Sequence, residues 1–163
     1  MNIRPATGAD IGSIINLERQ CASAAHWSEQ QYQQNFQAGG NGPERIVLLV
    51  EGSFPASAPE ASASSGVLGF LVAVHVAREW ELENLVVAPS ARREGLGKRL
   101  LDALLAAAQA TDSLAVFLEV RESNVAARAL YEKAGLEQIG RRRSYYSASR
   151  EDAILYRLDL NPK

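Results

Sequence analysis

The run Arg92-Arg93-Glu94-Gly95-Leu96-Gly97-Lys98-Arg99 combines two glycines with four basic side chains. It follows an apolar stretch typical of a strand, Leu85–Ala88, and precedes an amphipathic pattern that continues through Leu100–Leu105. Glycines that open a helix expose backbone N–H groups, and the helix dipole adds positive potential at the same place. This turn therefore predicts a binding site for a phosphorylated ligand.

Glu119 is a carboxylate inside an apolar run, Leu114–Val120, that predicts a strand. Burying an unpaired carboxylate is costly, so its presence needs an explanation. It could form an ion pair with Arg121, which two-residue spacing places on the same face, or it could face water at the strand end. Alternatively, it could act as a general base at the carboxyl end of a strand, a usual place for sites in α/β sheets.

Tyr131 lies in a predicted helix, Asn124–Ala134, and allows two similar interpretations. Its helical neighbours Ala127 and Leu130 favour a role in packing, whereas its phenol could also take part in chemistry. Trp27 likewise could belong to the core or line a cleft. These residue types alone do not decide between structure and chemistry.

Strands and helices alternate along the chain, with no internal repeats. The Ala/Ser/Pro-rich residues 52–66 predict a long flexible hairpin loop, because the strands on either side need each other. The order predicts one α+β domain over residues 1–163, built around a mixed sheet. The expected elements are the strand Asn2–Ala6, a helix capped by Thr7 and Asp10, a helix from Ser28 capped by Gln31, the strands Ile46–Glu51, Val67–Ala77 and Glu81–Ala88, the helix ending near Ala110, the strand Leu114–Val120, the helix Asn124–Ala134, and the strands Leu136–Arg142 and Ala153–Leu160.

Composition narrows the classes of protein. The 163 residues are 47% hydrophobic and 22% charged, which predicts a globular domain with a sizeable core. A net charge of −2 gives no reason to expect a nucleic-acid binder. No apolar run approaches the ~20 residues of a membrane-spanning helix, and the N-terminus shows no signal segment. We therefore expect a cytoplasmic protein that does not bind membranes.

Cysteine and histidine are scarce. The single cysteine, Cys21, excludes an internal disulfide and is expected to be a small buried residue on a helix. His26 and His75 are too few and too far apart in sequence to predict a metal site or a catalytic triad. We expect no metal.

The strand, the Arg-x-x-Gly-x-Gly turn and the following helix resemble the acetyl-coenzyme A signature of the GCN5-related N-acetyltransferases (GNAT). Two segments, Leu118–Asn124 and Ala129–Leu136, follow at the separation that this family shows. The resemblance extends to the RimI-type enzymes, which acetylate the N-terminal alanine of a small-subunit ribosomal protein, and it covers about residues 1–160. The segments that carry it are Ala25–Ser28, Glu81–Val87, Arg142–Tyr146 and Glu151–Ala153.

The resemblance implies a sheet in which two central parallel strands splay apart and acetyl-CoA lies in the V between them. The expected cofactor-binding residues are Leu85, Val86 and Val87 for the pantetheine arm, Arg92, Arg93, Glu94, Gly95, Leu96, Gly97 and Lys98 for the pyrophosphate, with Asn124 and Tyr131. Both glycines of the turn are expected to permit close approach of the backbone.

The resemblance also implies the chemistry. Glu119 matches the base and Tyr131 the acid, for direct attack of an amine on the thioester without an acyl-enzyme. An α-amine has a pKa of ~7.7–8.0 and is roughly one-tenth neutral at pH 7, whereas a lysine amine at ~10.4 would need about 4.6 kcal/mol to lose its proton. A single carboxylate base therefore favours a protein N-terminus over a lysine as acceptor.

The acceptor side is less determined. Its expected residues are Trp27, Glu81, Glu83, Asn84, Tyr145 and Tyr146, with the two tyrosines in a loop over the cleft. Glu83 stands where the family more often has an apolar residue. The acceptor partner would be a protein N-terminus, including that of a ribosomal protein, bound by a monomer or weak dimer. Two alternatives are a GNAT enzyme for small-molecule amines and a non-catalytic acyl-CoA-binding module.

Overall fold

The structure is a computed structural model that describes residues 1–36, 42–53, 65–146 and 148–160. Its sheet has seven strands in the order β1-β2-β3-β4-β5-β7-β6. Every neighbouring pair is antiparallel except β4 and β5, which are parallel, so the expected mixed sheet of an α+β fold is confirmed. The strands are Asn2–Pro5 (β1), Glu44–Ser53 (β2), Ser65–Val76 (β3), Glu79–Val87 (β4), Ala115–Arg121 (β5), Glu137–Tyr146 (β6) and Glu151–Asp159 (β7).

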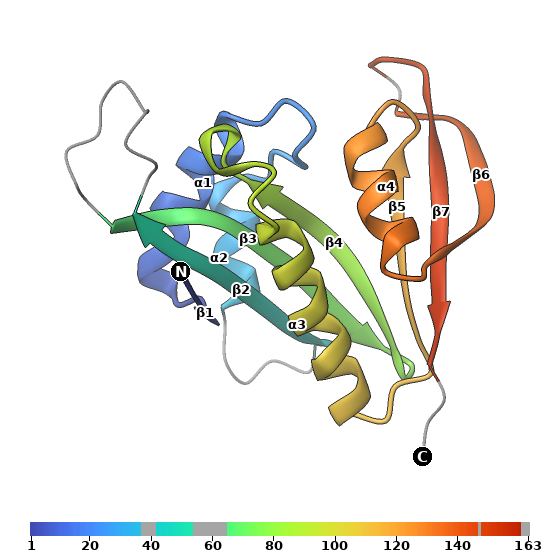
Figure 1. The fold of residues 1–163 in the computed structure, drawn as a ribbon, viewed down its shortest axis with the longest axis horizontal. Coiled ribbons are helices and arrows are strands. Elements are labelled where there is room, and N and C mark those ends of the chain that lie inside the picture. The colour runs from blue at the N-terminus through green and yellow to red at the C-terminus, as the bar shows by residue number, and fades with distance from the viewer. Residues whose placement is uncertain (37–41, 54–64, 147, 161–163) are drawn as a thin grey trace.

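Helices cover both faces of the sheet (Figure 1). Helices α1 (Ile11–Arg19) and α2 (Glu29–Asn35) lie on one side of β2–β4, and α3 (Leu96–Ala110) lies on the other. Helix α4 (Val125–Lys133) lies against the β5–β7 part. The short 3-10 helices η1 (Gly8–Asp10) and η2 (Pro89–Ala91) precede α1 and α3. Among the described residues, no helix is long and apolar enough to cross a bilayer.

Three helical segments begin at the predicted caps. The backbone N–H of Thr7 donates to the carboxylate of Asp10 at 2.8 Å. Ser28 and Gln31 form a reciprocal pair, in which each backbone N–H donates to the other side chain, at 2.7 and 3.2 Å. The carboxamide oxygen of Asn124 accepts the backbone N–H three residues later at 3.3 Å. These contacts satisfy N–H groups that a helix leaves unpaired.

Two expectations about strand ends were wrong. Leu114 lies outside β5 and is 37% exposed, because the strand begins one residue later. Tyr145 and Tyr146 are not in a loop: β6 continues through them, and Tyr146 pairs with Glu151 of β7. The backbone N–H of Ser144 donates to Asp152 at 2.8 Å, which fastens this irregular part of β6 to its neighbour.

The predicted hairpin loop is shorter than expected at both ends. Gly52 pairs with Gly66 and Ser53 with Ser65, so these residues belong to β2 and β3. The remaining residues of the predicted loop, 54–64, lie outside the described part of the chain. The antiparallel pairing of β2 with β3 itself is as predicted.

The two parallel strands separate halfway along their length. They pair only from Glu79 with Ala115 to Leu82 with Leu118. Beyond that point β4 and β5 diverge (Figure 1), as the family resemblance implied. On its other side β4 carries a bulge, because Leu82 pairs with Ala73 and Asn84 with Val72 of β3, which leaves Glu83 as the extra residue. We call the point where β4 and β5 stop pairing the fork. It lies at the same place along β4 as the bulge.

A buried polar network fastens the fork to the N-terminal helices. The Asn84 side chain donates to the Glu18 carboxylate at 2.9 Å and to the Tyr32 hydroxyl at 3.2 Å. Asn84 and Glu18 are only 6% and 2% exposed, and Tyr32 is fully buried. Because these residues belong to β4, α1 and α2, the network joins three elements just beyond the bulge.

Replacing Asn84 with alanine would leave the buried Glu18 carboxylate without its amide donor. We expect the free energy of unfolding to fall by about 2–4 kcal/mol, measured by urea denaturation, because a buried charged group would lose its hydrogen bond. Asn16→Ala, at an exposed position of α1, is the matched control and should change stability by less than about 0.5 kcal/mol. Equal losses in the two variants would contradict a structural role for the network.

Candidate active site

A cavity of about 770 Å³ lies where β4 and β5 diverge. Its walls come from the end of β4, the turn before α3, and α4. All residues predicted to bind the cofactor line it except Glu94, which is exposed. The lining residues are Cys21, Ser23, Leu85, Val86, Val87, Ala91, Arg92, Arg93, Gly95, Leu96, Gly97, Lys98, Asn124, Ala126, Ala127, Ala129, Leu130, Tyr131, Lys133 and Ala134.

The two glycines of the turn are required for different reasons. Gly95 precedes the first residue of α3 and has a φ of +76°, in the left-handed region that favours glycine. A Cβ at this position would meet no protein atom within 4 Å. At Gly97, in contrast, a Cβ would lie 3.2 Å from Leu130 of α4. Of these two glycines, Gly97 is needed for the close approach of α4, and Gly95 is needed for its backbone conformation.

The N-terminus of α3 provides positive potential at the edge of the cavity. Its first N–H groups have no partner within the helix, and the dipole of this 15-residue helix points its positive end there. Arg92 is held in place, because its Nε donates to the Val87 carbonyl at 3.4 Å and its Nη2 lies 3.7 Å from the sulfur of Cys21. The Cys21 thiol also donates to the Val87 carbonyl, at 3.7 Å.

Some lining residues were not predicted. Cys21 is buried as expected, but it lies just after α1 and forms part of the cavity wall. Four alanines of the α4 region also line the cavity, and their small side chains leave space beside the helix. The repeated alanines after Asn124 could have indicated this face, whereas nothing in the sequence places Cys21 beside Arg92.

Glu119 lies at the fork itself. Glu83 and Glu119 each follow the last paired residue of their strand. The Glu119 side chain is 16% exposed, and its Oε1 lies 3.1 Å from Nη2 of Arg142 on β6. The ion pair with Arg121 considered above was wrong, because Arg121 instead lies 3.7 Å from Glu151.

The strand order explains why Arg142 reaches Glu119. Strand β7 separates β5 from β6, and Ala153 of β7 pairs with Arg121 on one side and with Arg142 on the other. Alanine has a short side chain, so it leaves room for a long side chain from β6 to cross β7. Sequence spacing alone could not reveal this neighbour, because 23 residues separate Glu119 from Arg142.

Three carboxylates and two guanidinium groups gather near the fork. Burial raises the pKa of Glu81 above its usual value, and Glu119 adds to the effect, while Arg142 and Arg45 oppose it. Burial also raises the pKa of Glu83, which Arg45 opposes from 2.6 Å. These five residues come from four strands, namely β2, β4, β5 and β6. The electrostatic balance of the fork is therefore set jointly by several elements.

Two tyrosines, Tyr131 in the cavity wall and Tyr146 on β6, have raised pKa values. Tyr131, which lines the cavity, is almost fully buried, and burial raises its pKa well above the usual value, with a smaller contribution from Tyr146. Burial likewise raises the pKa of Tyr146, while the Arg121 guanidinium, 4.0 Å above its ring, opposes the shift and Glu119 adds to it. Tyr146 thus lies close enough to both Tyr131 and Glu119 to influence each of them.

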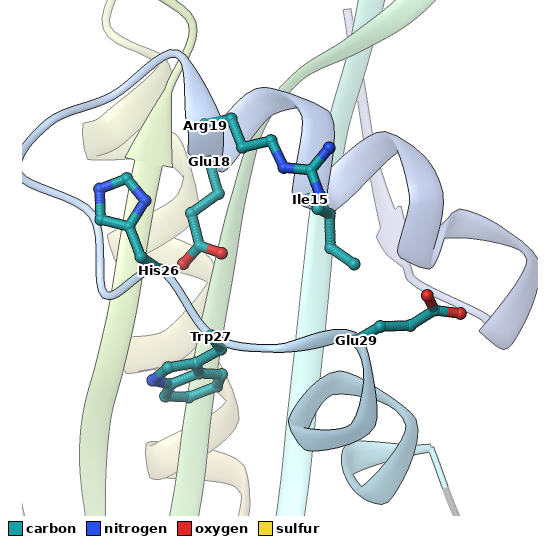
Figure 2. A pocket seen from close by; sticks show the side chains of 6 residues that line it. All are labelled: Ile15, Glu18, Arg19, His26, Trp27 and Glu29. Atoms are coloured by element: carbon teal, nitrogen blue, oxygen red, sulfur yellow. The ribbon is translucent and has the colours of Figure 1, made fainter.

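Trp27 lines a separate cavity of about 210 Å³ beside α1 (Figure 2). Its ring also packs at 5.4 Å from that of Tyr32. Figure 2 shows the Glu18 carboxylate directed toward His26 and Trp27. Trp27 therefore packs against the core, as one of the two interpretations had it, and its expected place in the acceptor cleft stays a prediction. Over residues 1–36, 42–53, 65–146 and 148–160, no three His, Cys, Asp or Glu side chains gather as a metal site would require.

Comparison with known proteins identifies the family. The model of the acetyltransferase (GNAT) family matches residues 13–136. This chain belongs to the GNAT family. The [ribosomal protein bS18]-alanine N-acetyltransferase of Escherichia coli K12 is 39% identical over 154 residues, which are 93% of each chain. The protein of that name from Salmonella typhimurium is 33% identical over the same length and coverage.

Comparison with solved structures supports the same family. The crystal structure of the Escherichia coli ribosomal-protein-S18-alanine N-acetyltransferase matches with a TM-score of 0.74 and 29% identity, covering 98% of this chain and 94% of the other. The resemblance to GNAT enzymes, and within them to the RimI type, is thereby confirmed. The cavity at the fork consequently lies in the part of the chain that the family model matches.

A Gly95→Ala substitution tests the left-handed turn at the start of α3. We expect the free energy of unfolding to fall by about 1–2 kcal/mol, because a Cβ is unfavourable in this conformation. Gly95→Asn should cost less, since asparagine tolerates positive φ. Thermal unfolding measures both, with Gly8→Ala as control, where an added Cβ has free space and φ is not positive. Equal losses for alanine and asparagine would contradict the conformational explanation.

Proposed function

We propose that this protein transfers an acetyl group from acetyl-CoA to the N-terminal α-amine of a protein. Family membership and the names of the relatives support this activity, and the observation that carries it is the fork. There, a cavity is lined by a turn suited to an anion and by the protonated phenol of Tyr131, and the Glu119 carboxylate lies where β4 and β5 stop pairing. The relatives act on the alanine of a ribosomal protein, and we propose such an N-terminus as the acceptor.

The cavity suits acetyl-CoA on several grounds. The N-terminus of α3 and the N–H groups around Gly95 and Gly97 provide donors for a pyrophosphate. Beyond Leu82, β4 no longer pairs with β5, so the backbone of Leu85–Val87 has polar groups available for an extended amide-containing arm on that side. Acetyl-CoA would supply a thioester whose carbonyl carbon accepts the amine and whose sulfur leaves as a thiolate.

Glu119 is proposed as the base that receives the proton of the attacking amine, directly or through one water. It stands one residue beyond the last pair of β4 and β5, which supports a place for it between the cavity and the proposed acceptor side. An α-amine needs little help, because roughly one-tenth of it is already neutral at pH 7. One carboxylate is sufficient for this acceptor, and such groups typically contribute ~10²–10⁴-fold to the rate.

Tyr131 is proposed as the donor to the departing sulfur. Because burial raises its pKa, the phenol stays protonated at neutral pH and can donate a hydrogen bond into the cavity. A thiol titrates near ~8.5, so complete proton transfer from the phenol to a thiolate is uphill. We infer that Tyr131 stabilises the thiolate first by hydrogen bonding, and that the proton follows as the product is released.

The acceptor side is proposed to lie between the segment after α1 and the β6–β7 hairpin. Tyr145 is half-exposed there and contacts Tyr146 edge-on, with ring centroids 5.2 Å apart. Glu81 and Glu83 lie at the bulge beside it. Asn84 is not proposed to touch the acceptor, because its side-chain donors are used inside the fold by Glu18 and Tyr32.

The direct test is acetyl-CoA turnover on peptides that differ in their first residue, followed by mass spectrometry. We expect acetylation of the α-amine alone, fastest on peptides beginning with alanine, and none on an internal lysine of the same peptide. Free amino acids and polyamines serve as controls. Activity confined to free amines would assign the protein to small-molecule acetyltransferases, and acetyl-CoA binding without any turnover would indicate a binding module.

Substitutions at the two proposed catalytic residues separate chemistry from binding. We expect Glu119→Gln and Tyr131→Phe each to lower kcat by about 10²-fold or more, as expected for lost acid–base groups. The dissociation constant for acetyl-CoA, measured by calorimetry, should change by less than about twofold. Glu137→Gln, at the exposed start of β6, is the control for a lost carboxylate. A Glu119→Gln enzyme with normal kcat would remove Glu119 from the mechanism.

A further inference from the structure

Arg142 has an unusual position for an arginine on an edge strand. Its guanidinium extends from β6 across β7 to lie 3.1 Å from Glu119 Oε1, although more than half of its side chain is exposed. It also lies over the ring of Tyr145, with 5.4 Å to the centroid. It therefore contacts both the proposed base and an aromatic wall of the acceptor side.

The backbone around Arg142 is fastened on both sides. Arg141 pairs with Asp152 and Glu122, both at 2.8 Å, and the N–H of Ser144 donates to Asp152 at 2.8 Å. Ser144 has a φ of +49°, a conformation that costs energy for a residue with a Cβ. The strand is thus held in a specific irregular shape that presents Arg142, rather than leaving it as a mobile surface side chain.

Arg142 offsets part of the negative charge of the carboxylates near Glu119. Of the three carboxylates at the fork, Glu83 is paired with Arg45 at 2.6 Å. Glu81 and Glu119 have Arg142 as their shared nearby cation, because the same guanidinium that pairs with Glu119 also acts on Glu81. Without Arg142, Glu119 would lose its paired cation, and Glu81 would keep only Arg45 of its two opposing guanidinium groups, where the acceptor amine is proposed to arrive.

An attacking amine must come close to Glu119. A general base acts within about 2.6–3.2 Å of the proton it takes, or through one water. The Arg142 guanidinium already occupies part of that shell. A neutral amine can share this space, whereas the Arg142 guanidinium repels an ammonium ion and so offsets the attraction of the nearby carboxylates.

We propose that Arg142 is a specificity-determining residue, which excludes protonated amines from Glu119 and so selects acceptors that carry a neutral amine. This inference rests on the proposed function, since it takes Glu119 as the base. An α-amine at pH 7 is neutral in roughly one molecule of ten, whereas a lysine amine is neutral in about one of 2,500. Arg142 thus converts a difference in amine pKa into selection of a protein N-terminus over lysines and polyamines.

The test compares two peptides of identical sequence in the complex with CoA, in which no transfer can occur. One begins with alanine, and in the other a hydroxyl replaces its amine. At pH 6 about 98% of the α-amine is protonated, so the ratio of the two dissociation constants, measured by calorimetry, reports how strongly the site disfavours the cation.

The ratio in wild-type protein is the reference, because there the guanidinium groups of Arg142 and Arg45 oppose the attraction of the ammonium by three carboxylates. In Arg142→Met the ratio should shift by about tenfold in favour of the ammonium, since a like charge at this range is typically worth about one pKa unit or more. Arg142→Lys keeps the positive charge and should therefore keep the wild-type ratio. Arg143→Met removes the same charge from the next, exposed residue and should leave the ratio unchanged.

An unchanged ratio in Arg142→Met, or an equal shift in Arg143→Met, would overturn the role of Arg142. Turnover on the alanine peptide with acetyl-CoA is measured on the same preparations. If wild-type protein acetylates the peptide but the ratio does not respond, only the inference about Arg142 fails. If the ratio responds and no peptide is acetylated, the proposed function fails while the exclusion of cations at this site stands.

Discussion

The end of pairing between β4 and β5 is the constraint on which the rest of the structure depends. Two adjacent strands that separate expose backbone N–H and C=O groups, which is costly unless other partners are found. Here each strand keeps its outer neighbour: β4 pairs with β3 as far as Val87, and β5 pairs with β7 as far as Arg121. The sheet therefore stays continuous on both sides of the fork, and the cost is limited to one edge of each diverging strand.

The fork also separates two kinds of electrostatic environment. On the cavity side, the N-terminus of α3 and its basic turn favour a multiply charged anion. At the bulge, three glutamates are balanced by Arg45 and Arg142, which come from strands on opposite sides of the fork. An anionic donor and an amine acceptor can thus approach the same point without competing for the same charges. Tyr131 lines the cavity, and Glu119 lies one residue beyond the last pair of β4 and β5.

How far sequence could predict this site depended on whether a feature was local. The Gly-rich turn, the caps at Ser28 and Asn124, and the strand–turn–helix order are set by residues close together in the chain, and the structure has them as predicted. Packing at a distance was not predictable in this way. Arg142 reaches Glu119 only because β7 lies between their strands, and Cys21 meets Arg92 through a contact 71 residues apart.

The same distinction explains where prediction was wrong. Tyr145 and Tyr146 were expected in a loop, because the family resemblance implied one over the acceptor cleft. Instead, Tyr146 pairs with Glu151 and the backbone N–H of Ser144 donates to Asp152, so β6 continues through both tyrosines. The network of the Asn84 amide with Glu18 and Tyr32 was not foreseen either, whereas its role toward the acceptor stays a prediction. In both cases a hydrogen bond to a remote residue decided the structure.

The cavity and the proposed acceptor side are built mostly from different parts of the chain. The cavity is built mainly from the middle, residues 85–134, which includes the turn and α4. The proposed acceptor side uses the β6–β7 hairpin together with the segment after α1, of which Cys21 and Ser23 also line the cavity. A change at Arg142 would therefore alter the proposed acceptor side without touching the turn before α3. A fork held from outside by β3 and β7 allows this independence, because neither outer strand lines the cavity.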